Sequence, residues 1–302
     1  MFTIKHRAAR LLLAFLLGTA VVTVRPSLHL MASEKPGLGQ NQQPMLQPAS
    51  AKTPDIPFDT ESAAEQRLLE LANQARQQAG APPLELDPGL SHAALIHAQS
   101  MLEAQQLSHQ FSGELSLPQR LAIATSLQLD QEAENVALDY DADHGHQHLM
   151  LSPPHRANLL NPAYNVVGLG VVRSGDRLYI VQDFGHALPN YSSAEIKERI
   201  AAAVNQTRRV QNQSQLPQVE FLNADDAACS MAQADKLGTS AVRSLSQRYT
   251  VLTYTSLHPE TLPGAATHAL SSRNLRRFSV GACYGRSDTY PTGVYWVVLT
   301  LE

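Results

Sequence analysis

The stretch from Ala133 to Leu160 concentrates the residues of this chain that could do chemistry. Imidazole nitrogens and carboxylate oxygens are ligands that zinc and similar cations take in proteins. A carboxylate beside an imidazole could also transfer protons without a metal, and such clusters also serve as hydrogen-bonded structural groups. The stretch therefore predicts a metal site, a proton-transfer site or a polar structural cluster, formed by some of Glu134, Asn135, His144, His146, His148 and His155.

His144 and His148 would share one face of a helix capped by Asp141 or Asp143, because they stand four residues apart. Such a pair could chelate a metal ion, or it could face solvent. Gly145, between the two histidines, weakens a helix at this point. We favour a position in solvent or at the rim of the site for the pair and keep His148 as a candidate accessory ligand.

The segments around this stretch predict a layered α/β domain. Apolar residues recur at helical spacing over residues 65–80, which end on a glycine, and over about 88–106. Residues 165–185 predict two β-strands joined by a Ser-Gly-Asp turn. The domain is expected to close near Leu188, so that it covers residues 61–188.

A second, diverged copy of this arrangement is predicted over residues 189–302. RLLELANQARQQ at 67–78 aligns with RIAAAVNQTRRV at 199–210, and HAALIHAQ at 92–99 aligns with DAACSMAQ at 226–233. The hairpin sequences VVGLGVV and SVGACYG align as well. The second copy lacks the Glu-Asn pair and the histidine-rich stretch, and two unrelated helix-plus-hairpin domains could also look alike.

The N-terminus is typical of an exported protein. Positive residues between positions 5 and 10 precede an apolar run at 11–24, which is shorter than the roughly 20 residues of a membrane-spanning helix. We interpret residues 1–32 as a signal peptide, with an uncleaved anchor as the alternative, and residues 33–60 as a flexible linker. The rest of the chain would then lie outside the cytoplasm, and only an uncleaved N-terminal segment would contact the membrane.

Composition and cysteine content narrow the function further. The 302-residue chain has a formal net charge of −4 and no basic cluster beyond its N-terminus, which argues against nucleic-acid binding. Its two cysteines, Cys229 and Cys283, are too few for a disulfide scaffold. In an oxidising compartment they could form one disulfide, or they could remain two buried thiols.

Several short motifs of the first domain occur in an order and spacing that resemble one family. They are Asn73-x-x-Arg76, Ser108-His109, Glu134-Asn135-Val136-Ala137, Ser152-Pro153-Pro154-His155-Arg156-Ala157-Asn158, Val167-Gly168-Leu169-Gly170 and Val181-Gln182-Asp183-Phe184. Residues 65–184 thus resemble the CAP family, also called SCP domains, of cysteine-rich secretory proteins, antigen 5 and pathogenesis-related proteins. The bacterial branch is the most similar, because this domain contains no cysteine. The resemblance implies an α/β fold, an α-β-α sandwich of CAP type with a central cleft, followed by a degenerate CAP-like α/β domain.

The resemblance also implies a cleft site. Two histidines and two acidic residues line the cleft of this family and can bind zinc or another divalent cation. His109, Glu134 and His155 occupy three of these positions, while the fourth, an acid, falls near Ser152 in this chain, with His148 as a tentative substitute ligand. Asn135 and Arg156 are expected to organise the backbone beside the cleft, which completes the predicted set of His109, Glu134, Asn135, Ser152, His155 and Arg156.

These features favour a secreted, non-enzymatic binding protein, although they leave enzymatic activity open. As the resemblance implies, its cleft would hold a small lipid-like molecule, a cell-envelope component or an extracellular protein. The alternative is a metal-dependent extracellular hydrolase or peptidase. The sequence has neither a His-Glu-x-x-His helix nor a serine nucleophile with an identifiable orienting partner. A purely structural envelope protein is a third hypothesis.

Overall fold

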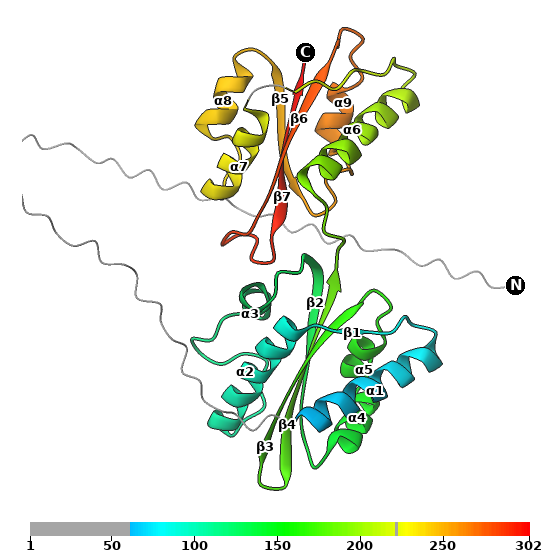
Figure 1. Ribbon diagram of the computed structural model, residues 1–302, viewed down its shortest axis with the longest axis vertical. Coiled ribbons are helices and arrows are strands. Elements are labelled where there is room, and N and C mark those ends of the chain that lie inside the picture. Colours follow the sequence, from blue (N-terminus) through cyan, green and yellow to red (C-terminus); the bar gives the residue numbers. More distant parts are fainter. Residues whose placement is uncertain (1–60, 221–222) are drawn as a thin grey trace, which may run out of the picture. The chain divides into compact units, whose positions relative to one another are not determined.

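The computed structural model describes residues 61–220 and 223–302. The predicted signal peptide and linker lie outside the described residues. The chain has an α/β fold with two β-sheets, whose strands pair mostly antiparallel. Helices cover both faces of each sheet (Figure 1). No helix within the described part is long and apolar enough to cross a membrane.

The first sheet has the strand order β1-β3-β4-β2. Strands β3 (Val166–Ser174) and β4 (Arg177–Ala187) form the predicted hairpin, which turns at Gly175 with a φ of 60°. Strand β2 (Leu129–Asp139) pairs antiparallel to β4 and forms one edge. The short β1 (Glu85–Leu86) pairs parallel to β3 at the other edge.

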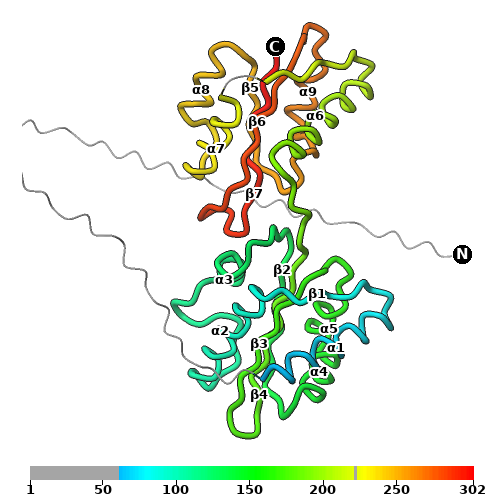
Figure 2. The backbone as a smooth tube through the Cα atoms, viewed as in Figure 1, coloured from blue at the N-terminus to red at the C-terminus, as the bar shows by residue number. Residues whose placement is uncertain are grey.

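Helices cover both faces of this sheet (Figures 1 and 2). Helices α1 (Ser62–Ala79), α4 (Ala142–Leu151) and α5 (Pro153–Leu160) pack against one face, where Leu68, Leu159, Ile180 and Phe184 are buried. Helices α2 (Pro88–Ala104) and α3 (Leu117–Ala124) cover the other face. The predicted three-layer α-β-α arrangement of this segment is therefore confirmed.

Glycines in β3 allow α2 to pack directly on the sheet. A Cβ built on Gly168 would lie 2.1 Å from the carbonyl carbon of Leu90, and one on Gly170 would lie 2.2 Å from the amide nitrogen of Leu95. No side chain fits at such distances, so glycine at both positions sets how closely α2 approaches β3.

The second sheet has the strand order β5-β7-β6. It consists of β5 (Thr250–Ser256), β6 (Phe278–Gly285) and β7 (Val294–Leu301), which pair antiparallel. Helices α6 (Ser193–Val210) and α9 (Gly264–Ala269) cover one face, and α7 (Ala224–Ala234) and α8 (Ser240–Ser246) cover the other (Figure 1).

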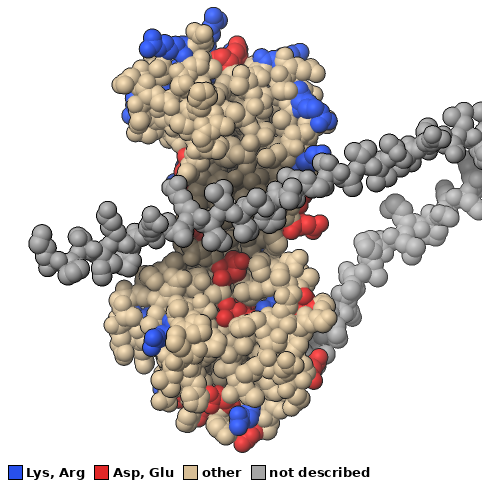
Figure 3. All heavy atoms as spheres, turned by 180° about the vertical axis from the view of Figure 1, so that it is seen from behind, with Lys and Arg blue, Asp and Glu red and all other residues tan. Residues whose placement is uncertain are grey.

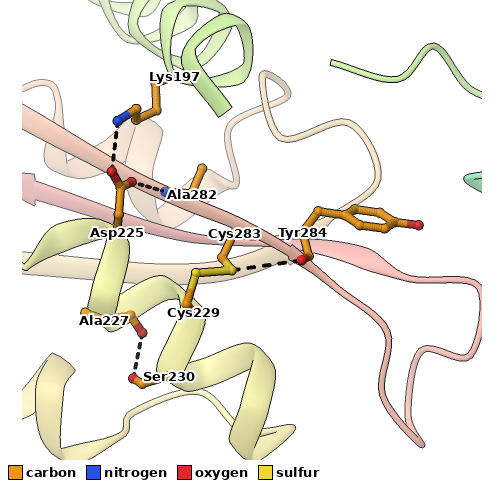
Figure 4. Close-up of a disulfide and its surroundings, with 8 residues drawn as sticks. All are labelled: Lys197, Asp225, Ala227, Cys229, Ser230, Ala282, Cys283 and Tyr284. Carbon is orange, nitrogen blue, oxygen red and sulfur yellow. Dashed lines mark hydrogen bonds and ion pairs between the residues drawn. A yellow bond between two sulfur atoms is a disulfide. The ribbon is translucent and has the colours of Figure 1, made fainter. Parts of the chain in front are cut away.

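A disulfide joins Cys229 of α7 to Cys283 of β6, with their Cα atoms 5.0 Å apart (Figure 4). Of the two alternatives that the sequence left open, the structure shows the disulfide rather than two free thiols. The bond ties the helix to the strand beside a second link between the same elements, in which the amide of Ala282 donates to the Asp225 carboxylate over 3.1 Å.

Hydrogen bonds to loops recur at equal spacing in the two parts of the chain. Asn73 exchanges two hydrogen bonds with the backbone of Leu84, and Asn205 does the same with Leu216, eleven residues further on in each case. The buried Arg76 and Arg208 each donate to the carbonyl six residues further on and to more distant loop carbonyls. These shared details support the prediction of an internal repeat.

Candidate functional site

Glu134, in the edge strand β2, lies at the centre of a polar cluster. Its side chain is only 3% exposed. His109 Nδ1 lies 2.9 Å from its Oε1 atom, and the guanidinium of Arg120 donates to its Oε2 atom over 2.5 Å. Both carboxylate oxygens therefore have partners, one of them a buried cation, and this offsets the cost of burying the charge.

Glu114, in the loop before α3, is a second carboxylate of this cluster. It accepts hydrogen bonds from the amide of Phe111 (2.8 Å) and from Arg120 (3.1 Å), and its Oε1 atom lies 2.6 Å from His97 Nδ1. Burial alone would raise the pKa of Glu114, but the Phe111 amide, His97 and Arg120 outweigh it and lower this pKa. Arg120 thus bridges the carboxylates of Glu114 and Glu134.

His97 links the cluster to α2. The side chain is fully buried, with Nε2 2.8 Å from the carbonyl oxygen of Ser108 and 3.7 Å from Glu134 Oε2. Both ring nitrogens of His97 therefore have hydrogen-bond partners. The carbonyl of Ser108 is adjacent to His109, so this contact also fixes the loop that carries His109.

Asp183, in β4, lies directly opposite Glu134 in the β2–β4 ladder. It is completely buried, and neither side-chain oxygen has a hydrogen-bond donor. Burial first, and then the negative charge of Glu134, raise the pKa of Asp183 well above its usual value. The raised pKa means that this position favours the protonated form of Asp183 over the charged one.

His155, in α5, lies at the exposed side of the cluster. Burial and the neighbouring charge of His109 lower its pKa. The backbone beside it is held by Asn135, whose amide donates to the His155 carbonyl (3.1 Å) and whose Oδ1 atom accepts from Asn158 (2.9 Å). Asn135 therefore has the backbone-organising position that the sequence predicted, and it links β2 to α5.

Comparison with known proteins matches this part of the chain to a protein family. Residues 69–184 match the model of the cysteine-rich secretory protein family, CAP. This segment is a CAP domain. The YkwD protein of Bacillus subtilis (strain 168) is 32% identical over 115 residues, which are 38% of this chain and 44% of that protein. The chain thus matches less than half of the length of this relative. The family model and this relative confirm the prediction of a bacterial-type CAP domain.

Solved structures of the same kind were also found. An extracellular SCP-domain protein from Bacillus anthracis str. Ames is 26% identical, covers 41% of each chain and has a TM-score of 0.37. Na-ASP-1 is 8% identical and has a TM-score of 0.43, with 81% of this chain and 91% of that chain covered.

Three predicted residues lie apart from the cluster of the CAP domain. Ser152 lies between α4 and α5, where its carbonyl oxygen accepts from the amide of Arg156 over 2.9 Å, and the Arg156 side chain is exposed. His148 Nδ1 lies 2.5 Å from Asp139. Asp139 stands five residues along β2 from Glu134, so the two residues are roughly 17 Å apart. The second acid of the cluster is Glu114, which lies in the loop before α3 and not near Ser152. His148 as a ligand of the cluster stays a prediction, and its distance from Glu134 argues against it.

The cluster does not fit a metal centre as it is arranged. Arg120 holds one oxygen of Glu134 and His109 the other, so a cation would have to displace a buried guanidinium. Among the residues that the structure describes, no group of three or more His, Cys, Asp or Glu side chains is placed to hold a metal ion. Metal binding by His109, Glu134 and His155 stays a prediction, and the position of Arg120 argues against it.

Proposed function

We propose that this chain acts outside the cytoplasm as a non-enzymatic binding protein whose ligand contacts His109 and His155 of the CAP domain. One observation carries the proposal: His109 is 60% exposed, yet its Nδ1 atom is fixed by a carboxylate that is almost fully buried. A fixed, exposed imidazole above a buried network is a prepared contact for a ligand.

The network determines what the imidazole can offer. With Nδ1 donating to Glu134, the Nε2 atom is free to accept a hydrogen bond, or to donate one when the ring is protonated. His155 lies close enough for the charge of His109 to affect its pKa. Two neighbouring imidazoles would suit a ligand with hydroxyl, amide or phosphate groups, which are typical of lipid headgroups and envelope polymers.

The second half of the chain supports a functional origin for the cluster. Gly168 pairs with Asp183 in the first sheet, and Gly281, its counterpart in the predicted repeat, pairs with Val298 in the second. The residue opposite Val298 in the neighbouring strand is Thr253, where the first sheet has Glu134. The second sheet is thus built without the two acids. Because apolar residues usually replace buried charges at little cost, the fold does not require the cluster, and binding explains it better.

The alternative of a metal-dependent hydrolase or peptidase is less well supported. It requires a Glu134 oxygen that is free to ligate a cation or to accept a proton from water. Arg120 and His109 already bind the two oxygens. The ligand class that we propose is therefore a small lipid-like molecule or another envelope component, bound without turnover.

The proposal is tested with two probes, vesicles of phosphatidylcholine and phosphatidylglycerol, and purified peptidoglycan. Binding of the full chain is measured by co-sedimentation and compared with that of a His109→Ala/His155→Ala variant, which leaves Glu134 and Arg120 in place. The matched control is His92→Ala, an exposed histidine of α2.

We expect the wild type to bind one of the two probes. The His109→Ala/His155→Ala variant, called the cleft variant below, should bind that probe at least tenfold more weakly, and the control should bind it like the wild type. Binding of neither probe, or binding that the cleft variant retains, would contradict the proposal. Zinc-dependent cleavage of casein that the cleft variant loses would instead support the hydrolase.

A further inference from the structure

The histidines of α4 form an arrangement that is separate from the site of His109, Glu134 and His155, the cleft that the family resemblance implies. His144 Nδ1 lies 3.0 and 2.9 Å from the two carboxylate oxygens of Asp141, the N-cap residue of α4. One turn further on, His148 Nδ1 lies 2.5 Å from Asp139 Oδ2. Each ring therefore has one nitrogen fixed by a carboxylate, and its Nε2 atom is left for another partner.

Gly145 lets the helix approach the strand closely enough for these contacts. A Cβ on Gly145 would lie 2.6 Å from Ile180 Cδ1 and 3.7 Å from Asp139 Cβ. The sequence suggested that this glycine weakens the helix, but the structure shows a continuous α4 in which the buried Gly145 packs against the sheet. The glycine thus places the end of β2, with Asp139, beside the histidines.

We propose that His144 and His148 bind one divalent transition-metal ion, such as zinc, through their Nε2 atoms on the outer face of α4. The site is distinct from the cleft and does not depend on the proposed function. Histidines at positions i and i+4 of a helix lie on one face, and both side chains are accessible, with exposures of 57% and 61%.

The carboxylates provide what such a pair needs. Metal-ligating histidines commonly donate their other ring N–H to a carboxylate, which fixes the ring and makes it a stronger ligand. Asp141 and Asp139 have this role for the two rings, and the charges of Asp139 and Asp143 also act on His144. A bound cation would neutralise part of this negative charge, and water would complete its coordination.

His146, the third histidine of the helix, does not belong to the site. It stands two residues from each ligand and is partly buried, and its Nδ1 atom has no hydrogen-bond partner. Burial lowers its pKa. Its position agrees with a helix that has one metal-binding face and one face turned to the protein.

The test is a calorimetric titration of the full chain with zinc chloride. We expect one equivalent to bind, with affinity at least tenfold weaker in His144→Ala/His148→Ala. Asp139→Asn, which keeps both ligands and removes a supporting charge, should weaken binding about ten- to a hundredfold. His92→Ala and the His109→Ala/His155→Ala cleft variant should bind zinc within about twofold of the wild type.

A second measurement works on the wild-type protein and so does not depend on how the variants fold. In ¹⁵N NMR spectra of the imidazoles, zinc should shift the Nε2 resonances of His144 and His148 and leave that of His92 in place. Absence of zinc binding, or full binding by the double variant, would overturn the proposal. Loss of binding in the cleft variant alone would do so too, because it would place the metal in the cleft and not on α4.

Discussion

At the scale of single residues, Asp183 makes a direct prediction about pH. Its pKa is raised by burial and by Glu134, so the folded protein keeps a proton that the unfolded chain releases above a pH of about 4. Stability is therefore lost as the pH rises through the unfolded pKa towards the folded one. Removing the charge should remove this loss.

We expect Asp183→Asn to unfold at higher urea concentration than the wild type at pH 7, because asparagine has no charge to bury. The difference should shrink as the pH falls below about 4, where Asp183 becomes protonated in the unfolded chain as well. Asp176→Asn, in the exposed turn between β3 and β4, is the matched control and should change little at either pH. Lower stability of Asp183→Asn at pH 7 would instead mean that Asp183 is ionised and stabilised by Arg120.

Part of the candidate site could be predicted from sequence. His109, Glu134 and His155 belong to motifs of fixed spacing, and the structure brings them to one place. Glu114 and Arg120 could not be found in this way, because they stand in a loop and a short helix without a periodic pattern. Asp183 is within a motif, but only the register of β4 against β2 shows that it faces Glu134.

At the scale of elements, the packing of a helix against a glycine in each sheet gives the next prediction. A Cβ on Gly168 would meet the backbone of Leu90, and one on Gly281 would lie 2.1 Å from the carbonyl oxygen of Ala224. Backbone cannot move aside as a flexible side chain can. The first contact lies between β3 and α2, and the second lies between β6 and α7.

We therefore expect Gly168→Ala and Gly281→Ala each to lower the free energy of unfolding by about 1–3 kcal/mol, as overpacking does. Gly264→Ala is the control, because a Cβ there meets nothing within 4 Å and alanine favours α9. Urea unfolding monitored by circular dichroism measures all three. Equal stability of Gly168→Ala and the control would show that α2 can shift away from β3 without cost.

The elements themselves were largely predictable where periodicity is strong. The first helix was expected at 65–80 and spans Ser62–Ala79, with Gly80 in the left-handed conformation that ends it. The second was expected at about 88–106 and spans Pro88–Ala104. The strand β2 was not predicted, because its polar residues Glu132, Glu134 and Asn135 hide the pattern of an edge strand that carries the site.

At the scale of the whole molecule, charge differs between the two predicted domains. Residues 61–188 contain 15 acidic and six basic residues, whereas residues 189–302 contain nine acidic and eleven basic ones. The face in Figure 3 shows acidic side chains mainly over one part and basic ones mainly over the other. A negative domain concentrates cations and repels anions near its surface. This favours the proposed cation site on α4, and it favours zwitterionic over anionic headgroups as ligands of the cleft.

The disulfide supplies the last prediction, because it links residues 54 positions apart in the chain. Closing a loop of this size lowers the conformational entropy of the unfolded chain, which stabilises the folded protein by about 4 kcal/mol if entropy is the only effect. Measured effects of disulfides are often smaller. We expect Cys229→Ser/Cys283→Ser to lower the free energy of unfolding by about 2–4 kcal/mol. Dithiothreitol should lower the free energy of unfolding of the wild type to that of the variant and leave that of the variant unchanged.

A variant as stable as the oxidised wild type would mean that α7 and β6 are held by packing and by Asp225 alone. The expected loss would instead tie the stability of the second sheet to an oxidising compartment, in agreement with an exported protein.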